Sequence, residues 1–121
     1  MSEMYLSITG VNHYYGMEPF AIGRRFLCVK EPDNPYDDEA IRVVLPLKGV
    51  VGYVANSVYS RAKGTLSAGR IYPEVGDRFL VQVAFSTHST VIAKVVESDS
   101  HEIPMDLFTE NREEITEYLR I

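Results

Sequence analysis

The sequence has no tryptophan, a single cysteine and no long hydrophobic run. With Cys28 alone, no intramolecular disulfide can form, which is typical of a protein from a reducing compartment. No apolar stretch approaches the roughly 20 residues that cross a bilayer, and the first residues do not have the pattern of a secretion signal. We therefore expect a cytoplasmic protein without a membrane partner, in which Cys28 is a small buried hydrophobic residue.

The sequence also lacks the basic excess that nucleic-acid binders usually carry. Its formal net charge is −5, and the charge is unevenly distributed. Residues 1–96 contain ten Lys and Arg and nine Asp and Glu, whereas residues 97–121 contain two basic and eight acidic residues. This balance argues against tight non-specific binding to phosphates. It also predicts a domain over residues 1–100 followed by an acidic extension over 101–121, with a short helix from Glu110 to Ile121.

Signatures of catalysis and of metal binding are missing as well. There is no Gly-x-Ser-x-Gly elbow, no P-loop and no cysteine with a plausible histidine base. His13, His88 and His101 lie far apart and lack the spacing of zinc ligands. The acidic run 37–39 is typical of a solvated turn. We therefore expect a protein that is not an enzyme and has no cofactor or metal.

Short β-like segments bounded by turn residues make up most of the sequence. They predict strands at residues 4–12, 25–30, 41–45, 50–54, 78–86 and 91–96, with turns at 46–49 and 87–90. A helix is predicted over 57–68, capped by Asn56 or Ser57 and ended by Gly69. Closure into a small barrel would remove the exposed strand edges, so we predict a mainly β barrel of about six strands with one or two short helices.

Alternation along the predicted strands indicates which side chains share a face. Phe79, Val81, Val83 and Phe85 fall on one face of the 78–86 strand, and adjacent Tyr14 and Tyr15 cannot both face the interior. The interior of so small a barrel is filled by side chains. Binding is therefore expected at its outer surface or rim.

The segment from Lys30 to Ile41, Lys-Glu-Pro-Asp-Asn-Pro-Tyr-Asp-Asp-Glu-Ala-Ile, is the most unusual in the chain. Its two prolines fix two φ angles, and Pro35 favours an extended Asn34. Asp33 and Asn34 can bond back to the main chain as Asx-turns. The tip of this stiff loop presents Tyr36 beside Asp37, which pairs an aromatic face with a carboxylate.

Three blocks in order carry a resemblance: Gly-Val-Asn-His-Tyr-Tyr-Gly at 10–16, Glu-Pro-Asp-Asn-Pro-Tyr-Asp-Asp-Glu-Ala-Ile-Arg-Val at 31–43, and Val-Gly-Tyr-Val at 51–54. Together they resemble the HIRAN domain family over about residues 5–96. The resemblance implies an OB-like barrel, a modified form of the oligonucleotide-binding fold. In eukaryotic fork-remodelling ATPases this domain captures the 3′ end of single-stranded DNA.

The resemblance also implies roles for single residues. Tyr36 would stack on the terminal base, and Asp37 would accept a hydrogen bond from the terminal 3′-hydroxyl. Asn34 and Tyr53 would line the same pocket, with Phe85 on the opposite wall.

The sequence departs from the family at three further positions of the implied interface. Asn12 and His13 stand where DNA-binding members carry Arg and Tyr, and Asn56 stands where they carry Lys. The loss of these cations predicts binding that is weak and depends little on salt.

Two hypotheses therefore follow from the sequence. In the first, the protein binds single-stranded DNA 3′ ends and works with a helicase or other ATPase supplied by another chain. In the second, it is a protein-interaction adaptor that uses exposed aromatic residues and the acidic extension. The positions of Arg24, Arg25, Lys30 and Lys94 discriminate between them, because only a gathered positive rim favours DNA.

Overall fold

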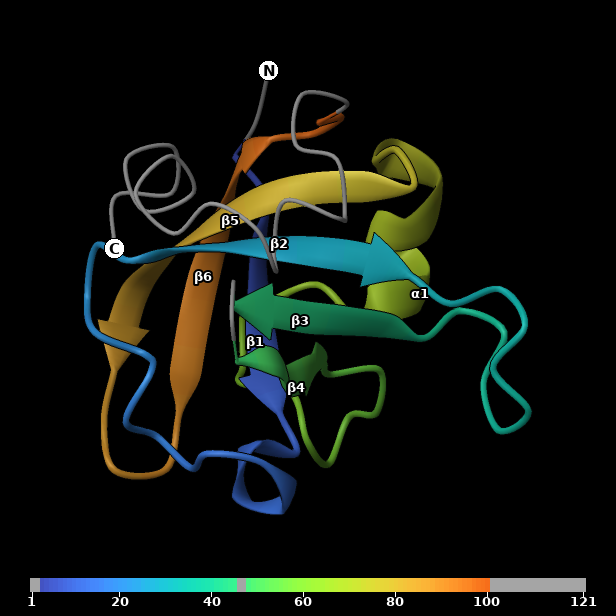
Figure 1. Ribbon diagram of the computed structural model, residues 1–121. Helices are drawn as coiled ribbons and strands as arrows, with labels where there is room; N and C mark the ends of the chain where they lie inside the picture. The colour runs from blue at the N-terminus through green and yellow to red at the C-terminus, as the bar shows by residue number, and fades with distance from the viewer. Residues whose placement is uncertain (1–2, 46–47, 101–121) are drawn as a thin grey trace.

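Six strands form one closed antiparallel barrel in the computed structural model, which describes residues 3–45 and 48–100 (Figure 1). The strand order around the barrel is β1-β4-β3-β2-β5-β6. The strands are β1 (Tyr5–Thr9), β2 (Arg25–Lys30), β3 (Ile41–Leu45), β4 (Gly49–Val54), β5 (Arg78–Ser86) and β6 (Val91–Glu97). Closure leaves no unpaired edge, and the predicted fold class is confirmed. The predicted helix at 110–121 lies outside the described residues.

The interior is filled by apolar side chains, as the alternation predicts. Phe26 and Phe79 are fully buried, as are Val43 and Val51 from the facing strands. Cys28 is also fully buried, which confirms the prediction for this residue, and burial raises the pKa of its thiol. Because side chains occupy this space, a ligand has to bind at the surface.

Two short helical elements lie at one end of the barrel, beside the end of β2 (Figure 1). They are the helix α1 (Ala68–Ile71) and the 3-10 turn η2 (Tyr72–Glu74). Ser67 caps α1, because its Oγ accepts a hydrogen bond from Arg70 N at 3.2 Å. Lys30 Nζ joins β2 to this end by donating to Val75 O at 2.6 Å. In the described part of the chain, no helix has the length and apolar character needed to cross a membrane.

The predicted helix over 57–68 is wrong. Residues 57–66 form turns instead, and the actual helix begins at Ala68, so Gly69 lies inside it. Leu66 N donates to Tyr5 O at 2.8 Å, which ties this segment to β1 rather than to itself. Gly64 has a φ of +91°, a left-handed conformation that interrupts a right-handed helix.

Two strand predictions are also corrected. The first strand ends at Thr9, because Gly10 has a φ of +72° and the 3-10 turn η1 (Val11–His13) follows. Phe85 leaves the face of Val83, because a register shift lies between these two residues against β6. Its side chain is 50% exposed, whereas Val83 is buried.

We expect Gly52→Ala to destabilise the barrel where β4 meets β1. A Cβ at this position would lie 2.9 Å from Ile8 Cγ2 and 3.0 Å from Thr9 O. Relieving these close contacts requires the backbone to move, so the free energy of unfolding should fall by about 1–3 kcal/mol. Urea denaturation measures the loss. A variant as stable as the original chain would show that β1 and β4 can separate freely.

Candidate functional site

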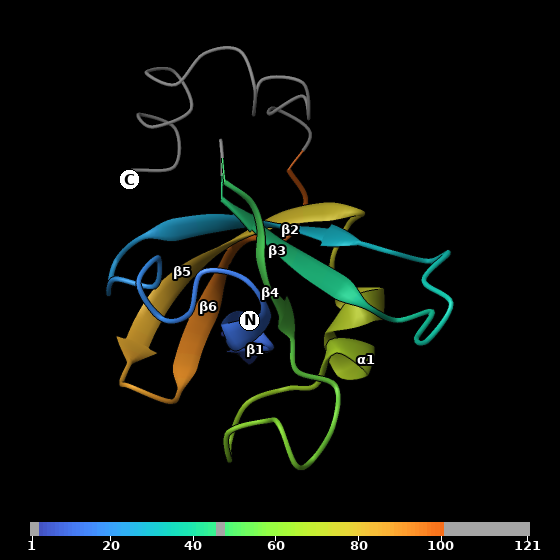
Figure 2. The same cartoon turned by 60° about the horizontal axis from the view of Figure 1, so that its bottom comes forward.

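The loop between β2 and β3 projects from the barrel, on the same side as α1 (Figures 1 and 2). Its base is closed by Glu31 N, which donates to Ala40 O at 2.8 Å. Within the loop, Asn34 Oδ1 accepts hydrogen bonds from Tyr36 N at 2.9 Å and from Asp37 N at 3.1 Å. The structure therefore confirms the Asx-turn predicted at Asn34, and this turn sets the directions of Tyr36 and Asp37.

A carboxylate joins this loop to the barrel. Glu31 accepts hydrogen bonds from Asn34 Nδ2 at 2.8 Å and from Tyr53 Oη at 2.9 Å, and it pairs with Arg42 Nη1 at 3.4 Å. Burial raises the pKa of Glu31, but these donors outweigh it and hold the pKa below its ordinary value. Partial burial and the bond to Glu31 raise the pKa of Tyr53 to about 12. The loop is thus fixed through an ionised Glu31 and a protonated Tyr53 hydroxyl.

Asp37 is held in place from two sides. Its Oδ1 accepts from Glu39 N at 2.9 Å, and its Oδ2 accepts from Asn56 Nδ2 at 2.9 Å. Asn56 Oδ1 in turn accepts from Gly69 N, in α1, at 2.8 Å. The Asn56 amide therefore bridges the loop and the helix. A carboxylate oxygen can accept more than one hydrogen bond, so each Asp37 oxygen can accept another.

These side chains meet at a surface groove that we call the loop groove. Its volume is about 690 Å³, and Tyr36 at its edge is 96% exposed. The predicted residues Asn34, Tyr36, Asp37, Tyr53 and Asn56 all lie along it. The described residues that line it are Asn34, Pro35, Tyr36, Asp37, Ala40, Tyr53, Val54, Asn56, Ser57 and Ser60.

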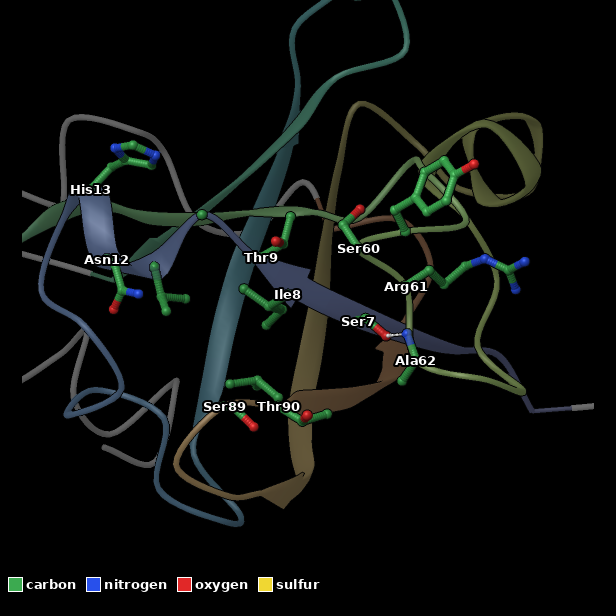
Figure 3. A pocket seen from close by; sticks show the side chains of 14 residues that line it. Ser7, Ile8, Thr9, Asn12, His13, Ser60, Arg61, Ala62, Ser89 and Thr90 are labelled. Atoms are coloured by element: carbon green, nitrogen blue, oxygen red, sulfur yellow. Dashed lines mark hydrogen bonds between the residues drawn. The ribbon is translucent and has the colours of Figure 1, made fainter.

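Asn12 and His13 do not lie in the loop groove but in a second groove of about 440 Å³, which we call the hydroxyl groove (Figure 3). Ser60 lines both grooves. The lining is Ser7, Ile8, Thr9, Gly10, Val11, Asn12, His13, Tyr59, Ser60, Arg61, Ala62, Ser89, Thr90 and Val91. Phe85 is not among the described residues that line either groove, so the structure does not place it opposite Tyr36.

The basic residues considered above do not gather into one rim. Arg24 Nη1 donates to Pro19 O. Lys94 lies on β6, which β5 separates from β2, and its Nζ pairs with Glu3 at 3.4 Å. Lys30 reaches Val75 O at the end of β2, whereas Arg25 begins the same strand. None of the four is among the described lining residues of the loop groove.

The sequence did not reveal Glu31 as the centre of the loop, nor Tyr59 as a groove residue. In the sequence Glu31 stands out only as the first residue of the block 31–43, because its partners Arg42 and Tyr53 lie on β3 and β4. Tyr59 fell inside the predicted helix, where nothing distinguishes it from an ordinary surface residue. Tyr14 and Tyr15 are both exposed, and Tyr14 lies 6.4 Å from Tyr53 between ring centroids.

We expect Glu31→Gln to lower the free energy of unfolding at neutral pH by about 1–3 kcal/mol, since three donors lose a charged acceptor. Because the folded pKa of Glu31 is depressed, its contribution is present above the unfolded value near 4.5 and is lost as pH falls through the folded pKa. The difference between the variant and the original chain should therefore shrink in acid. Urea denaturation across the pH range measures it.

The matched control is Asp33→Asn, which removes an exposed carboxylate from the same loop. This variant should be nearly as stable as the original chain at every pH. A Glu31→Gln effect that is equal at neutral and acid pH would contradict the role of the charge.

Comparison with known proteins agrees with this architecture. The chain is similar to the crystal structure of the HIRAN domain of human HLTF, with a TM-score of 0.55 and 17% identity over 98% of this chain and 87% of that chain. At this identity the likeness supports the fold alone. A search of curated proteins finds no match. The family model of the HIRAN domain matches residues 1–96, from before β1 to within β6, and the chain therefore belongs to the HIRAN domain family.

Proposed function

We propose that this chain is a non-catalytic module that binds the 3′ end of single-stranded DNA in the loop groove. HIRAN domains are known generally as nucleic-acid binding modules. The observation that carries the proposal is the placement of an exposed Tyr36 ring beside a fixed Asp37 carboxylate in one groove. We further propose that a helicase or other ATPase supplied by another chain is its working partner.

Tyr36 supplies the stacking surface. Its ring is almost fully exposed, while the backbone that carries it is held by Asn34 Oδ1. A base that stacks on the ring gains contact without displacing a packed side chain. Such stacking contributes about 1–3 kcal/mol per base and tolerates any sequence.

Asp37 selects a strand with a free 3′ end. A terminal 3′-hydroxyl can donate to the remaining lone pairs of the carboxylate, whereas a 3′-phosphate would be repelled by it. Asp38 and Glu39 are exposed next to it and strengthen this repulsion. Asn56 supports the role by fixing Asp37 Oδ2, which makes it a positioning residue in this proposal rather than a phosphate contact.

The charges of the groove predict weak salt dependence. No Lys or Arg is among its described lining residues, and Arg42 nearby is paired with Glu31. Each phosphate neutralised on a single strand adds a slope of about −0.7 to log affinity against log salt. With few phosphates neutralised at this groove, stacking and the hydroxyl bond carry most of the binding.

Two observations favour the second candidate function, a protein-interaction adaptor. Val58 and Tyr59 are adjacent, and their side chains are 72% and 97% exposed. The scattered positions of Arg24, Arg25, Lys30 and Lys94 point the same way. A partner protein with an apolar surface would fit this pair of side chains.

Fluorescence anisotropy with a labelled single strand tests the proposed function. We expect a strand with a free 3′-hydroxyl to bind more tightly than the same strand with a 3′-phosphate. Tyr36→Ala should weaken binding by about 5- to 150-fold, the equivalent of one lost stacking contact. Tyr36→Phe, which keeps the ring, and Phe85→Ala, which lies outside the groove, should bind as the original chain does.

Equal affinity for the two strand ends would show that Asp37 does not sense the end. If no strand binds at any practical concentration, the end-binding function fails and the adaptor function becomes the better account.

A further inference from the structure

The hydroxyl groove adjoins the loop groove and is built from different elements. Its walls are the end of β1 with η1, the 59–62 segment and the turn between β5 and β6 (Figure 3). Ser60 belongs to both linings, so the two grooves meet at this residue. A strand long enough to pass Ser60 can therefore contact both grooves.

The two grooves differ in charge. The loop groove contains Asp37, with Asp38 and Glu39 on the same loop. The described lining of the hydroxyl groove contains no Asp or Glu, and its ionisable residues of basic type are Arg61 and His13. The second groove therefore suits a phosphodiester better than the first does.

Hydroxyl groups line much of the second groove. Ser89 and Thr90 face Thr9 and Ser60 across it in Figure 3. Hydroxyls donate to phosphate oxygens without adding a cation, and such contacts are common in nucleic-acid complexes. Arg61 adds a positive charge to this lining, although its guanidinium points away from Ser89 and Thr90 in Figure 3 and donates to Thr65 O.

Hydrogen bonds to buried side chains hold the segment that carries Tyr59 and Arg61. Ser7 Oγ accepts from Ala62 N at 2.9 Å, the dashed line in Figure 3, and it bonds to Thr65 Oγ1 at 2.8 Å. Ser7 and Thr65 are both buried. Tyr59 is nevertheless 97% exposed, so the groove offers an aromatic face on a rigid support, as the loop groove does with Tyr36.

We propose that the hydroxyl groove is a second nucleotide-binding subsite, which takes nucleotides on the 5′ side of the two at the 3′ end. Tyr59 stacks on a base, and Ser89 and Thr90 donate to phosphate oxygens. The strand has a defined polarity, because the carboxylate of Asp37 accepts the 3′-hydroxyl and the preceding nucleotides run past Ser60 into the hydroxyl groove. The proposal rests on the function proposed for the loop groove and extends it.

Strand length separates the two sites experimentally. We compare anisotropy of a labelled dinucleotide with that of a strand of about eight nucleotides, both with free 3′-hydroxyls, since single-domain barrels of this type cover about 4–16 nucleotides. The longer strand should bind at least about fivefold more tightly, the lower limit for one stacking contact. Tyr59→Ala should weaken the longer strand by a similar factor and leave the dinucleotide unchanged.

Val58→Ala is the matched control, because Val58 is exposed next to Tyr59 but is not among the described residues of either groove. It should leave both affinities unchanged, and Tyr59→Phe should retain the longer strand. Circular dichroism confirms that each variant is folded.

Two results would overturn the second subsite while the loop groove stands: equal affinity for both strand lengths, or an unchanged affinity of Tyr59→Ala for the longer strand. Loss of dinucleotide binding in Tyr59→Ala would also overturn it, because Tyr59 would then act on the two nucleotides at the 3′ end. If the original chain binds neither strand, the proposed function itself fails.

Discussion

Closure of the barrel between β1 and β4 is the contact on which both grooves depend. Ile8 pairs with Val54 and Thr9 with Tyr53, and this short register completes the ring of strands. Gly52 permits the approach, because a Cβ at this position would lie too close to Ile8 and Thr9 of β1. At this junction Tyr53 lines the loop groove, and the end of β1 lines the hydroxyl groove. A shift of these two strands would therefore disturb both surfaces at once.

The surface that results is organised by acceptors rather than by cations. Glu31 accepts hydrogen bonds from Asn34 and Tyr53 and pairs with Arg42, so the Arg42 guanidinium is used inside the structure. Asp37 is oriented by an amide and a main-chain N–H, which leaves its charge intact. Such a surface attracts hydrogen-bond donors and flat rings more than dense negative charge. It distinguishes ligands by the chemical group at their end, and it adds little long-range attraction for a negatively charged ligand.

Much of the architecture could be predicted from local patterns, because short segments rich in β-forming residues are separated by turn residues. The prolines and Asn34 likewise indicated the rigid loop, since their constraints act within a few residues. The helix at 57–68 was wrong because Leu66 and Thr65 bond to β1, which lies far away in sequence. Phe85 was misplaced because a register shift changes the face without any sequence signal in the strand itself.

Part of the candidate site could likewise be predicted from the sequence, and part could not. Asn34, Tyr36, Asp37 and Tyr53 could be placed together because the family resemblance links the loop to the fourth strand. The bridging position of Asn56 could not be predicted, since it depends on where α1 begins. The hydroxyl groove joins η1, the 59–62 segment and the turn after β5, which are distant in sequence and meet only once the barrel has closed.

The burial of Cys28 has a practical consequence for probing this protein. It is the single thiol among the 121 residues, it is inaccessible, and its raised pKa keeps it protonated. Thiol reagents attack the thiolate, so the folded chain should be inert to them. A cysteine placed on the surface can then carry a spectroscopic label at a chosen position while Cys28 stays in the core. The native thiol becomes reactive only when the barrel opens. The rate of its modification therefore reports on the opening of the barrel.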